Sequence, residues 1–280
     1  MCRLRVLLVS DIHCHYDNER ALASWVQEHA DAVADLDLII ASGDIAVMKP
    51  ENNTDEAEVK KCEEDIAQVL ESIELVRSLI LAKEEQPTDD LLPIYWIPGN
   101  HDAVTTFTDR LPPMTEHSSN FHNAFVPIAR GLLLCGFGGS VPGYRNGQQV
   151  WEGYPYTDNP SMEPALASLL PVDSSNETQL LLVTHVGPSS SATAVDQVDL
   201  EKAEITTGSS ALDNLLRRPD MQSRVVVNVH GHTHRASGMA RVGKVPVVNP
   251  GALLFAQFGL LELVQKDGRW ALGDVRFVTL

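Results

Sequence analysis

Polar residues that can bind a metal ion or a phosphate group follow short apolar runs along this chain of 280 residues. In chain order they are Asp11-x-His13, Gly43-Asp44, Gly99-Asn100-His101-Asp102, His185 and Gly231-His232-x-His234. Imidazole nitrogens combined with carboxylate and amide oxygens suit manganese, iron, zinc or a similar divalent ion. Each motif alone occurs often by chance, but their joint order after apolar runs indicates one functional site.

The apolar runs have the length and composition of buried strands. The expected strands are residues 4–9, 36–40, 94–97, 132–137, 180–184, 225–229, 245–248, 253–263 and 270–277. A helix that opens at Asn18 separates the first two runs, and a strand, helix, strand unit implies parallel pairing. The carboxyl end of such a strand delivers side chains to a site, which is where the polar motifs stand.

A long helix is expected from Asp55 to about Lys83, because apolar residues recur there at alternating steps of three and four. Its apolar stripe should lie against the body, and its acidic face is interpreted as a solvated surface rather than a docking site. Helices and strands together predict an α/β fold, a four-layer α-β-β-α sandwich of two mixed sheets flanked by helices.

The composition is that of a globular protein, and we expect a single domain over residues 1–280. Lys and Arg number 21 against 38 for Asp and Glu, which gives a formal net charge of −17. Such a chain repels polyanions at long range, and no basic cluster offers a surface to a nucleic-acid backbone. Nucleic acid is therefore not an expected partner.

Cysteines and hydropathy point to the cytoplasm. Cys2, Cys14, Cys62 and Cys135 are scattered without a C-x-x-C pair, so neither a zinc ribbon nor a disulfide framework is indicated. The apolar run near the N-terminus passes into Asp11 without a small-residue cleavage site and is interpreted as a strand. No stretch reaches the roughly 18 to 20 apolar residues that span a bilayer, so no membrane association is expected.

In their order and residue types, the motifs resemble those of the calcineurin-like metallophosphoesterases. The resemblance implies that Asp11, His13, Asp44 and His234 hold a first metal ion, and that Asp44, Asn100, His185 and His232 hold a second. Asp44 would bridge the two ions. His101 would stay free of metal beside the scissile phosphate, and Asp102 is a candidate for orienting it, so both are expected catalytic residues.

The function that this resemblance implies is metal-dependent hydrolysis of phosphomonoesters or phosphodiesters by a hydroxide that bridges two divalent ions. The segments 136–140, 184–188 and 248–251 also resemble predicted archaeal and bacterial phosphoesterases near the cyclic-nucleotide phosphodiesterase branch. A small phosphoester is the expected partner. The alternatives are a protein Ser/Thr phosphatase, which needs an open groove for a peptide, and a non-catalytic scaffold of the same fold.

Aromatic residues are concentrated in the segment that follows Ser140. They are Tyr144, Trp151, Tyr154 and Tyr156, with Arg145 among them. Two interpretations stand side by side. The rings and the arginine could stack on a substrate ring and steady its phosphate, or the segment could pack its own aromatics over a sheet edge.

Overall fold

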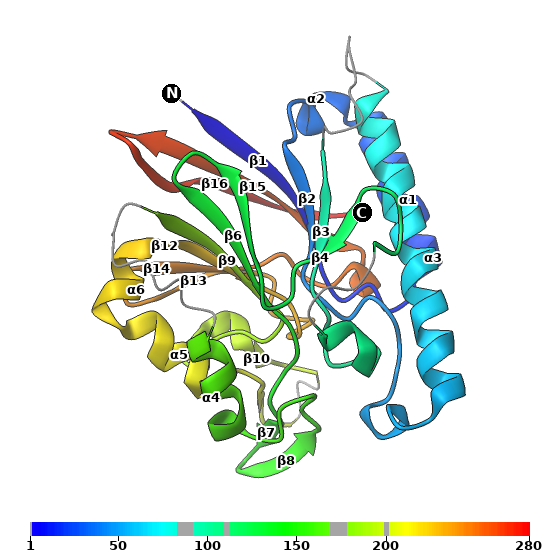
Figure 1. Ribbon diagram of the computed structural model, residues 1–280, viewed down its shortest axis with the longest axis vertical. Coiled ribbons are helices and arrows are strands. Elements are labelled where there is room, and N and C mark those ends of the chain that lie inside the picture. The colour runs from blue at the N-terminus through cyan, green and yellow to red at the C-terminus, as the bar shows by residue number, and fades with distance from the viewer. Residues whose placement is uncertain (1, 83–91, 109–112, 169–177, 199–201) are drawn as a thin grey trace.

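Two six-stranded sheets form the centre of the protein (Figure 1). A computed structural model describes residues 2–82, 92–108, 113–168, 178–198 and 202–280. The first sheet has the order β16 (Arg269–Thr279), β15 (Gln257–Lys266), β1 (Arg3–Val9), β2 (Leu38–Ala41), β3 (Ile94–Trp96) and β4 (Ser118–Asn120). The second has the order β13 (Gly238–Val242), β14 (Val245–Asn249), β12 (Val225–His230), β9 (Gln179–Thr184), β6 (Leu132–Phe137) and β5 (Phe125–Ala129).

Both sheets are mixed, and the central strands of each run parallel. β1 pairs in parallel with β2, β2 with β3, and β3 with β4, whereas β15 and β16 pair antiparallel at the other edge. In the second sheet β6, β9, β12 and β14 are parallel, and the edge strands β5 and β13 are antiparallel. The carboxyl ends of the parallel strands therefore lie along one edge of each sheet.

Helices cover the outer face of each sheet (Figure 1). The helices α1 (Tyr16–Glu28), α2 (Ala30–Val33) and α3 (Glu56–Leu81) belong to the first sheet. The helices α4 (Asn159–Ser168), α5 (Ser210–Arg217) and α6 (Pro219–Arg224) belong to the second. Short 3-10 turns are η1 (Pro50–Asn52), η2 (Val104–Phe107), η3 (Ala192–Ala194) and η4 (Leu253–Phe255).

Successive side chains of β1 point to opposite faces of the first sheet and so contribute to two separate apolar clusters. Val6 and Leu8 point between the two sheets, where they join side chains such as Val183 of β9. Leu7 and Val9 point the other way, into the cluster that α1 and α3 complete. A third apolar cluster lies between the second sheet and the helices α4 and α5. β1 thus contributes to two apolar clusters, because its side chains alternate between two faces of the sheet and both faces are buried.

The expected four-layer sandwich is confirmed, and α3 lies where the apolar stripe predicted it, with Asp55 as its N-cap. One expected strand was wrong in its first part. Within residues 253–263, Leu253–Phe255 form η4, which ends at Ala256 with φ 60°, and the strand starts only at Gln257. The backbone amides of Leu253 and Leu254 donate to the carbonyls of Ser10 and Asp11, so the turn is held against the end of β1 instead of joining the sheet.

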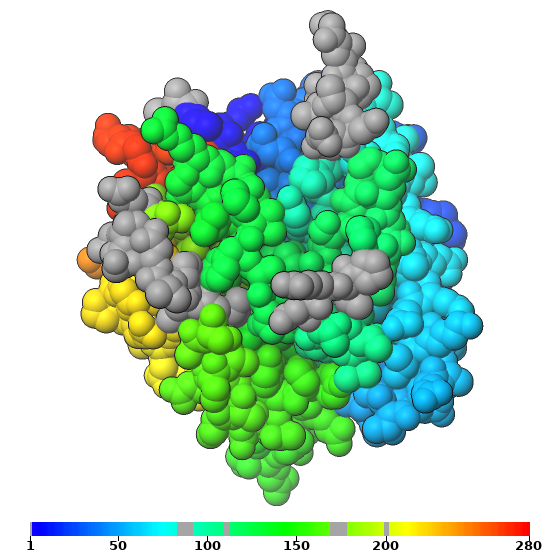
Figure 2. All heavy atoms as spheres, in the orientation of Figure 1, coloured from blue at the N-terminus to red at the C-terminus, as the bar shows by residue number. Residues whose placement is uncertain are grey.

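A small third sheet has the order β10 (Val195–Asp196), β11 (Ile205–Thr206), β7 (Gly143–Arg145) and β8 (Gln148–Trp151). β7 and β8 form a hairpin that projects at the lower edge in Figures 1 and 2. No helix among the described residues has the length and apolar character needed to cross a membrane.

The packing of α3 gives a test of the first core. Ile73 is fully buried there, whereas Leu75, two residues on, is 55% exposed. Ile73→Ala should lower the free energy of unfolding by about 2 to 5 kcal/mol, since it leaves a cavity. Leu75→Ala on the same helix should change it by no more than about 0.5 kcal/mol. Denaturant unfolding of both variants measures this, and equal losses would contradict the described packing.

Candidate metal centre

The first sheet supplies ligand candidates from the segments that follow β1 and β2. Asp11 and His13 come after β1, and Asp44 comes after β2. The amide of Asp11 donates to the carbonyl of Gly43, and the amides of Ile12 and His13 donate to the carbonyl of Asp44. These backbone bonds hold the two segments side by side, so three of the expected side chains converge.

Several of these residues have a backbone conformation that is rare for residues other than glycine. Asp11 and His13 have φ 51°, Asp44 has φ 52°, and His232 has φ 64°. Asp and His adopt this left-handed region more readily than most residues, yet it still costs about 1 to 3 kcal/mol each. Such conformations cluster at functional sites, where the surrounding bonds enforce them.

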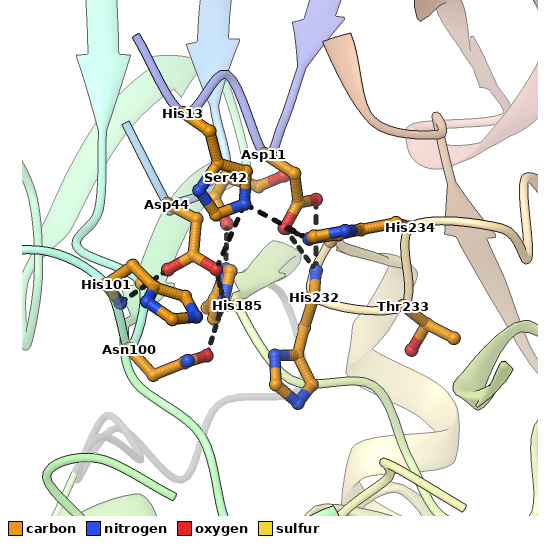
Figure 3. A network of polar contacts seen from close by, with 12 residues as sticks. Asp11, His13, Ser42, Asp44, Asn100, His101, His185, His232, Thr233 and His234 are labelled. Atoms are coloured by element: carbon orange, nitrogen blue, oxygen red, sulfur yellow. Dashed lines mark hydrogen bonds and ion pairs between the residues drawn. The ribbon is translucent and has the colours of Figure 1, made fainter. Parts of the chain in front are cut away.

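The second sheet brings three histidines to the same place (Figure 3). His185 follows β9, and His232 and His234 follow β12. The amide of His232 donates to both carboxylate oxygens of Asp11, at 3.0 and 3.1 Å. Nδ1 of His185 lies 2.8 Å from the carbonyl of Ser42. Direct bonds between the sheets therefore hold Asp11, His185 and His232 in place.

Two groups of side chains in this cluster could each hold a metal ion. One is Asp11, His13, Asp44 and His234, and the other is Asp44, His185 and His232. Within each group the ligand atoms lie no more than 4.8 Å apart, and Asp44 is common to both. Oδ1 of Asn100 lies 3.1 Å from Nε2 of His185, which puts the amide beside the second group.

The polar atoms at the centre of the cluster fit bound cations. Oδ2 of Asp44 and Nε2 of His232 are buried and have no hydrogen-bond partner among the described residues. Nε2 of His13 and Nε2 of His234 lie only 3.1 Å apart, and two imidazole lone pairs at this distance repel unless a proton or a metal ion lies between them. Buried polar atoms without partners are costly, and divalent ions would satisfy them.

Burial and charge set the protonation of the cluster. Burial alone would raise the pKa of Asp11, but His234 and His185 hold it at about 2. Burial also opposes ionisation of Asp44, yet His185 and His101 keep its pKa well below the usual range. Burial lowers the pKa of His232 to about 3. At neutral pH the site therefore presents two carboxylates and at least one neutral imidazole, the forms in which these groups bind metals.

His185 carries the bond pattern of a metal-binding histidine. Burial opposes protonation of its ring, but the charge of Asp44 raises its pKa to about 9. Its Nδ1 is taken by the carbonyl of Ser42, which leaves Nε2 facing Asp44 and Asn100. Histidine ligands commonly donate their other ring N–H in this way, which fixes tautomer and orientation.

Two glycines permit this close approach. A β-carbon on Gly99 would overlap the amide and carboxylate of Asp44, and one on Gly231 would overlap the hydroxyl of Ser10 and the carboxylate of Asp11. Each glycine directly precedes an expected ligand, Asn100 or His232. The Gly-Asn pair therefore reflects the close approach of the segments that follow β2 and β3, and the Gly-His pair reflects the small space between the two sheets.

His101 lies at the cluster without belonging to either ligand group. Its Nδ1 is 2.8 Å from the carbonyl of Met48, and the amide of Met48 donates back to the carbonyl of His101 at 2.8 Å. The amide of His101 donates to Oδ1 of Asp44 at 2.7 Å. The ring is thus anchored through Nδ1.

Asp102 makes different contacts from those expected. Its carboxylate accepts hydrogen bonds from the amides of Ile45, Ala46 and Gly99, at 3.2, 2.8 and 2.7 Å, and it is fully buried. Burial raises its pKa to about 6, although these amides oppose the shift. The carboxylate ties the segment after β2 to the segment after β3, while Met48 orients the His101 ring. Asp102 is thus a positioning residue for the backbone.

Some aromatic residues of the segment after Ser140 pack on the protein itself, and one of them lines the cleft. Tyr154 packs against Phe107, and Tyr156 stacks on the buried ring of Phe137 at 5.4 Å, so both rings pack against other parts of the protein. Arg145 donates to the carbonyl of Ala203 and is not among the residues that line the central cleft. Trp151 alone of this set faces the site, with its ring 5.9 Å from that of His232.

The cluster forms the floor of a cleft of about 390 Å³. Its walls are two short segments, Lys49 to Glu51 at the start of η1 and Val150 to Glu152 at the end of β8. Of these wall residues, the sequence points only to Trp151. The other wall residues belong to no recognisable sequence motif. They line the cleft because the turn at Pro50 and the hairpin place them there, and this placement cannot be recognised from residue types.

The chain belongs to the calcineurin-like phosphoesterase family. The family model matches residues 4–236, a range that includes Asp11 near its start and His234 near its end. The resemblance seen in the motifs is thereby confirmed. Curated proteins offer no match to this sequence.

Solved structures share the fold at low sequence identity. TT1561 of Thermus thermophilus has a TM-score of 0.53 and 15% identity over 98% of this chain and 99% of its own. A dimetal phosphatase from Danio rerio has a TM-score of 0.51 and 10% identity over 99% and 98%. GAP50, described as the anchor in the inner membrane complex of Plasmodium, has a TM-score of 0.51 and 13% identity over 100% and 85%.

Metal content tests the shared position of Asp44. Asp44→Asn should lower the occupancy of both ion sites, since this carboxylate belongs to both groups, whereas His13→Ala should lower mainly one. His29→Ala, which changes an exposed histidine, serves as the control and should keep the full content. Elemental analysis after equilibration with manganese gives the ions per chain. Equal losses for Asp44→Asn and His13→Ala would contradict the shared position.

Proposed function

We propose that this protein is a phosphoesterase that uses two divalent metal ions to hydrolyse phosphomonoesters or phosphodiesters. The observation that carries the proposal is the pair of ligand groups that share Asp44 at the floor of an open cleft. Asp11, His13, Asp44 and His234 would hold one ion, and Asp44, Asn100, His185 and His232 the other. Manganese, iron and zinc all suit this mixture of nitrogen and oxygen ligands.

When bound, two such ions neutralise phosphoryl oxygens and supply an activated water for in-line displacement. The chain's own contribution is charge and position. Asp11 and Asp44 provide two negative charges against four on the ions, so the floor of the cleft would stay cationic within an acidic protein. A phosphoester anion is attracted to such a floor although the net charge of the chain is −17.

His101 is the proposed catalytic residue of the chain itself. Its Nδ1 is committed to the carbonyl of Met48, and the protonated ring would present Nε2–H to the ester. That proton can pass to the leaving oxygen or stabilise charge on a phosphoryl oxygen. No serine or cysteine nucleophile is needed, and no phosphoenzyme is expected.

The alternatives fit less well. A volume of about 390 Å³ is that of a small-molecule site, whereas a protein phosphatase needs a groove that admits an extended peptide. Oδ2 of Asp44 and Nε2 of His232 are buried and have no hydrogen-bond partner among the described residues. A non-catalytic scaffold would gain nothing from leaving such polar atoms unsatisfied. The acidic surface supports a small phosphoester over nucleic acid as the partner. Four free cysteines support a reducing compartment, the cytoplasm.

Metal removal tests the proposal. The purified protein should hydrolyse mono- or bis(4-nitrophenyl) phosphate, lose the activity after chelation and dialysis, and regain it with manganese. The Asp44→Asn variant, carried through the same steps, should not regain it. Full activity in excess chelator would overturn the metal-dependent mechanism, and no activity on any ester with both ions bound would favour the scaffold.

The role of His101 predicts a dependence on the leaving group. His101→Asn should keep its metal content but lose roughly 10² to 10⁴ in rate on esters of poorly acidic alcohols. The loss should be much smaller for 4-nitrophenyl esters, because nitrophenolate departs without a proton. His117→Asn, which changes a histidine paired with Glu74, is the matched control and should be unaffected. A loss of metal instead would show that His101 is a ligand or a support.

A further inference from the structure

The walls of the cleft differ in character from its floor. The floor consists of metal-ligand candidates and His101, whereas Val150 and Trp151 line one wall and Pro50 lines the other. Val150 is 42% exposed, so much of its apolar side chain is open to a ligand. An apolar surface directly above a phosphate-binding floor is suited to the organic part of an ester.

The position of the Trp151 ring is set by its neighbours. The ring makes an edge contact with His232 at 5.9 Å, and the strand it ends pairs with Gly143 in β7. A β-carbon on Gly143 would meet the side chain of Trp151 at 3.3 Å and that of Ile205 at 3.4 Å. Gly143 thus leaves room for the side chain of Trp151, which lines the cleft beside His232.

The opposite wall is coupled to His101. Met48 exchanges two hydrogen bonds with His101, through the ring and through the backbone, and Lys49 and Pro50 follow it directly. Among the described residues that line the cleft, Lys49 is the only lysine or arginine. Its exposed side chain stands on the wall of the cleft as a single cation, not as part of an extended basic track. The cleft therefore offers positive charge for one phosphate group.

Charge at the rim works against a second anionic group. Glu51 and Glu152 are both exposed, and they stand on opposite walls of the cleft. A ligand that carries a carboxylate or a second phosphate beyond the first would meet these two negative charges. A ligand whose outer part is uncharged would not.

We propose that Trp151, Val150 and Pro50 form a leaving-group pocket that selects esters with one phosphate and an uncharged planar ring. The ring lies on the indole of Trp151 while the phosphate occupies the floor, and Glu51 and Glu152 reject rings that carry a further negative charge. This inference rests on the proposed function, because it needs the floor to hold a phosphoryl group.

Binding of non-hydrolysable phosphonates separates the two proposals. Isothermal titration calorimetry on the manganese-loaded protein would compare methylphosphonate, phenylphosphonate and 4-carboxyphenylphosphonate. Phenylphosphonate should bind most tightly. Trp151→Leu should weaken its binding roughly 10-fold and leave methylphosphonate unchanged, since stacking is lost but the floor is intact. Trp151→Phe, which keeps a planar ring, should recover most of the affinity.

The charged rim has its own comparison. The double variant Glu51→Gln, Glu152→Gln should bind 4-carboxyphenylphosphonate several-fold more tightly at low ionic strength, with a clearly smaller gain for phenylphosphonate, which lacks the carboxylate. Tyr144→Ala is the matched control for the tryptophan, because Tyr144 lies on the same hairpin but does not line the cleft. It should bind all three ligands as the unaltered protein does.

The outcomes differ for the two ideas. If the unaltered protein binds methylphosphonate and phenylphosphonate equally, or if Trp151→Leu weakens both or neither, the pocket is wrong while the phosphate-binding floor stands. If it binds neither phosphonate with manganese present, the proposed function fails and the pocket fails with it. Loss confined to the ring-bearing ligands supports the pocket.

Discussion

The burial of two carboxylates between the ends of the sheets is the constraint on which the site depends. Asp11 is fully buried and Asp44 is 1% exposed. Removing a charge from water is expensive unless hydrogen bonds and opposite charges replace its hydration. The replacement here comes from both sheets, from the amide of His232 to Asp11 and from His185 to Asp44. The carboxylates can therefore stay ionised only because the two sheets approach each other at this edge.

This arrangement satisfies the carboxylates only in part. Oδ2 of Asp44 has no hydrogen bond from the described residues, and several site residues hold left-handed backbone conformations. Both features lower the stability of the fold, and selection for stability alone would remove them. A polar cluster that is incompletely satisfied, buried and strained is characteristic of a site completed by a ligand, and metal ions are the ligands that these donor atoms suit.

The sequence predicted the parts of the molecule that have a period or a fixed order. The strands β1, β9 and β12 are nearly continuous apolar runs, and α3 has a regular stripe. The role of Asp102 was not predictable, because adjacency to His101 says nothing about which amides a carboxylate reaches in the fold. Nor was the small sheet, since strands of two residues such as β10 have no pattern. Tyr154 and Trp151 are three residues apart, and only the tertiary structure distinguishes the ring that packs on Phe107 from the ring that lines the cleft.

The hairpin of β7 and β8 is connected to the rest of the protein in a way that bears on how proteins of this family diversify. It pairs with β11 in the small sheet and with neither six-stranded sheet. Insertions or exchanges in it would therefore leave the strands that carry Asp44 and His185 in register. Under the proposed function, remodelling of this one appendage would change which substrate fits while the metal-binding groups stay in place, so the floor and the wall of the cleft could evolve at different rates.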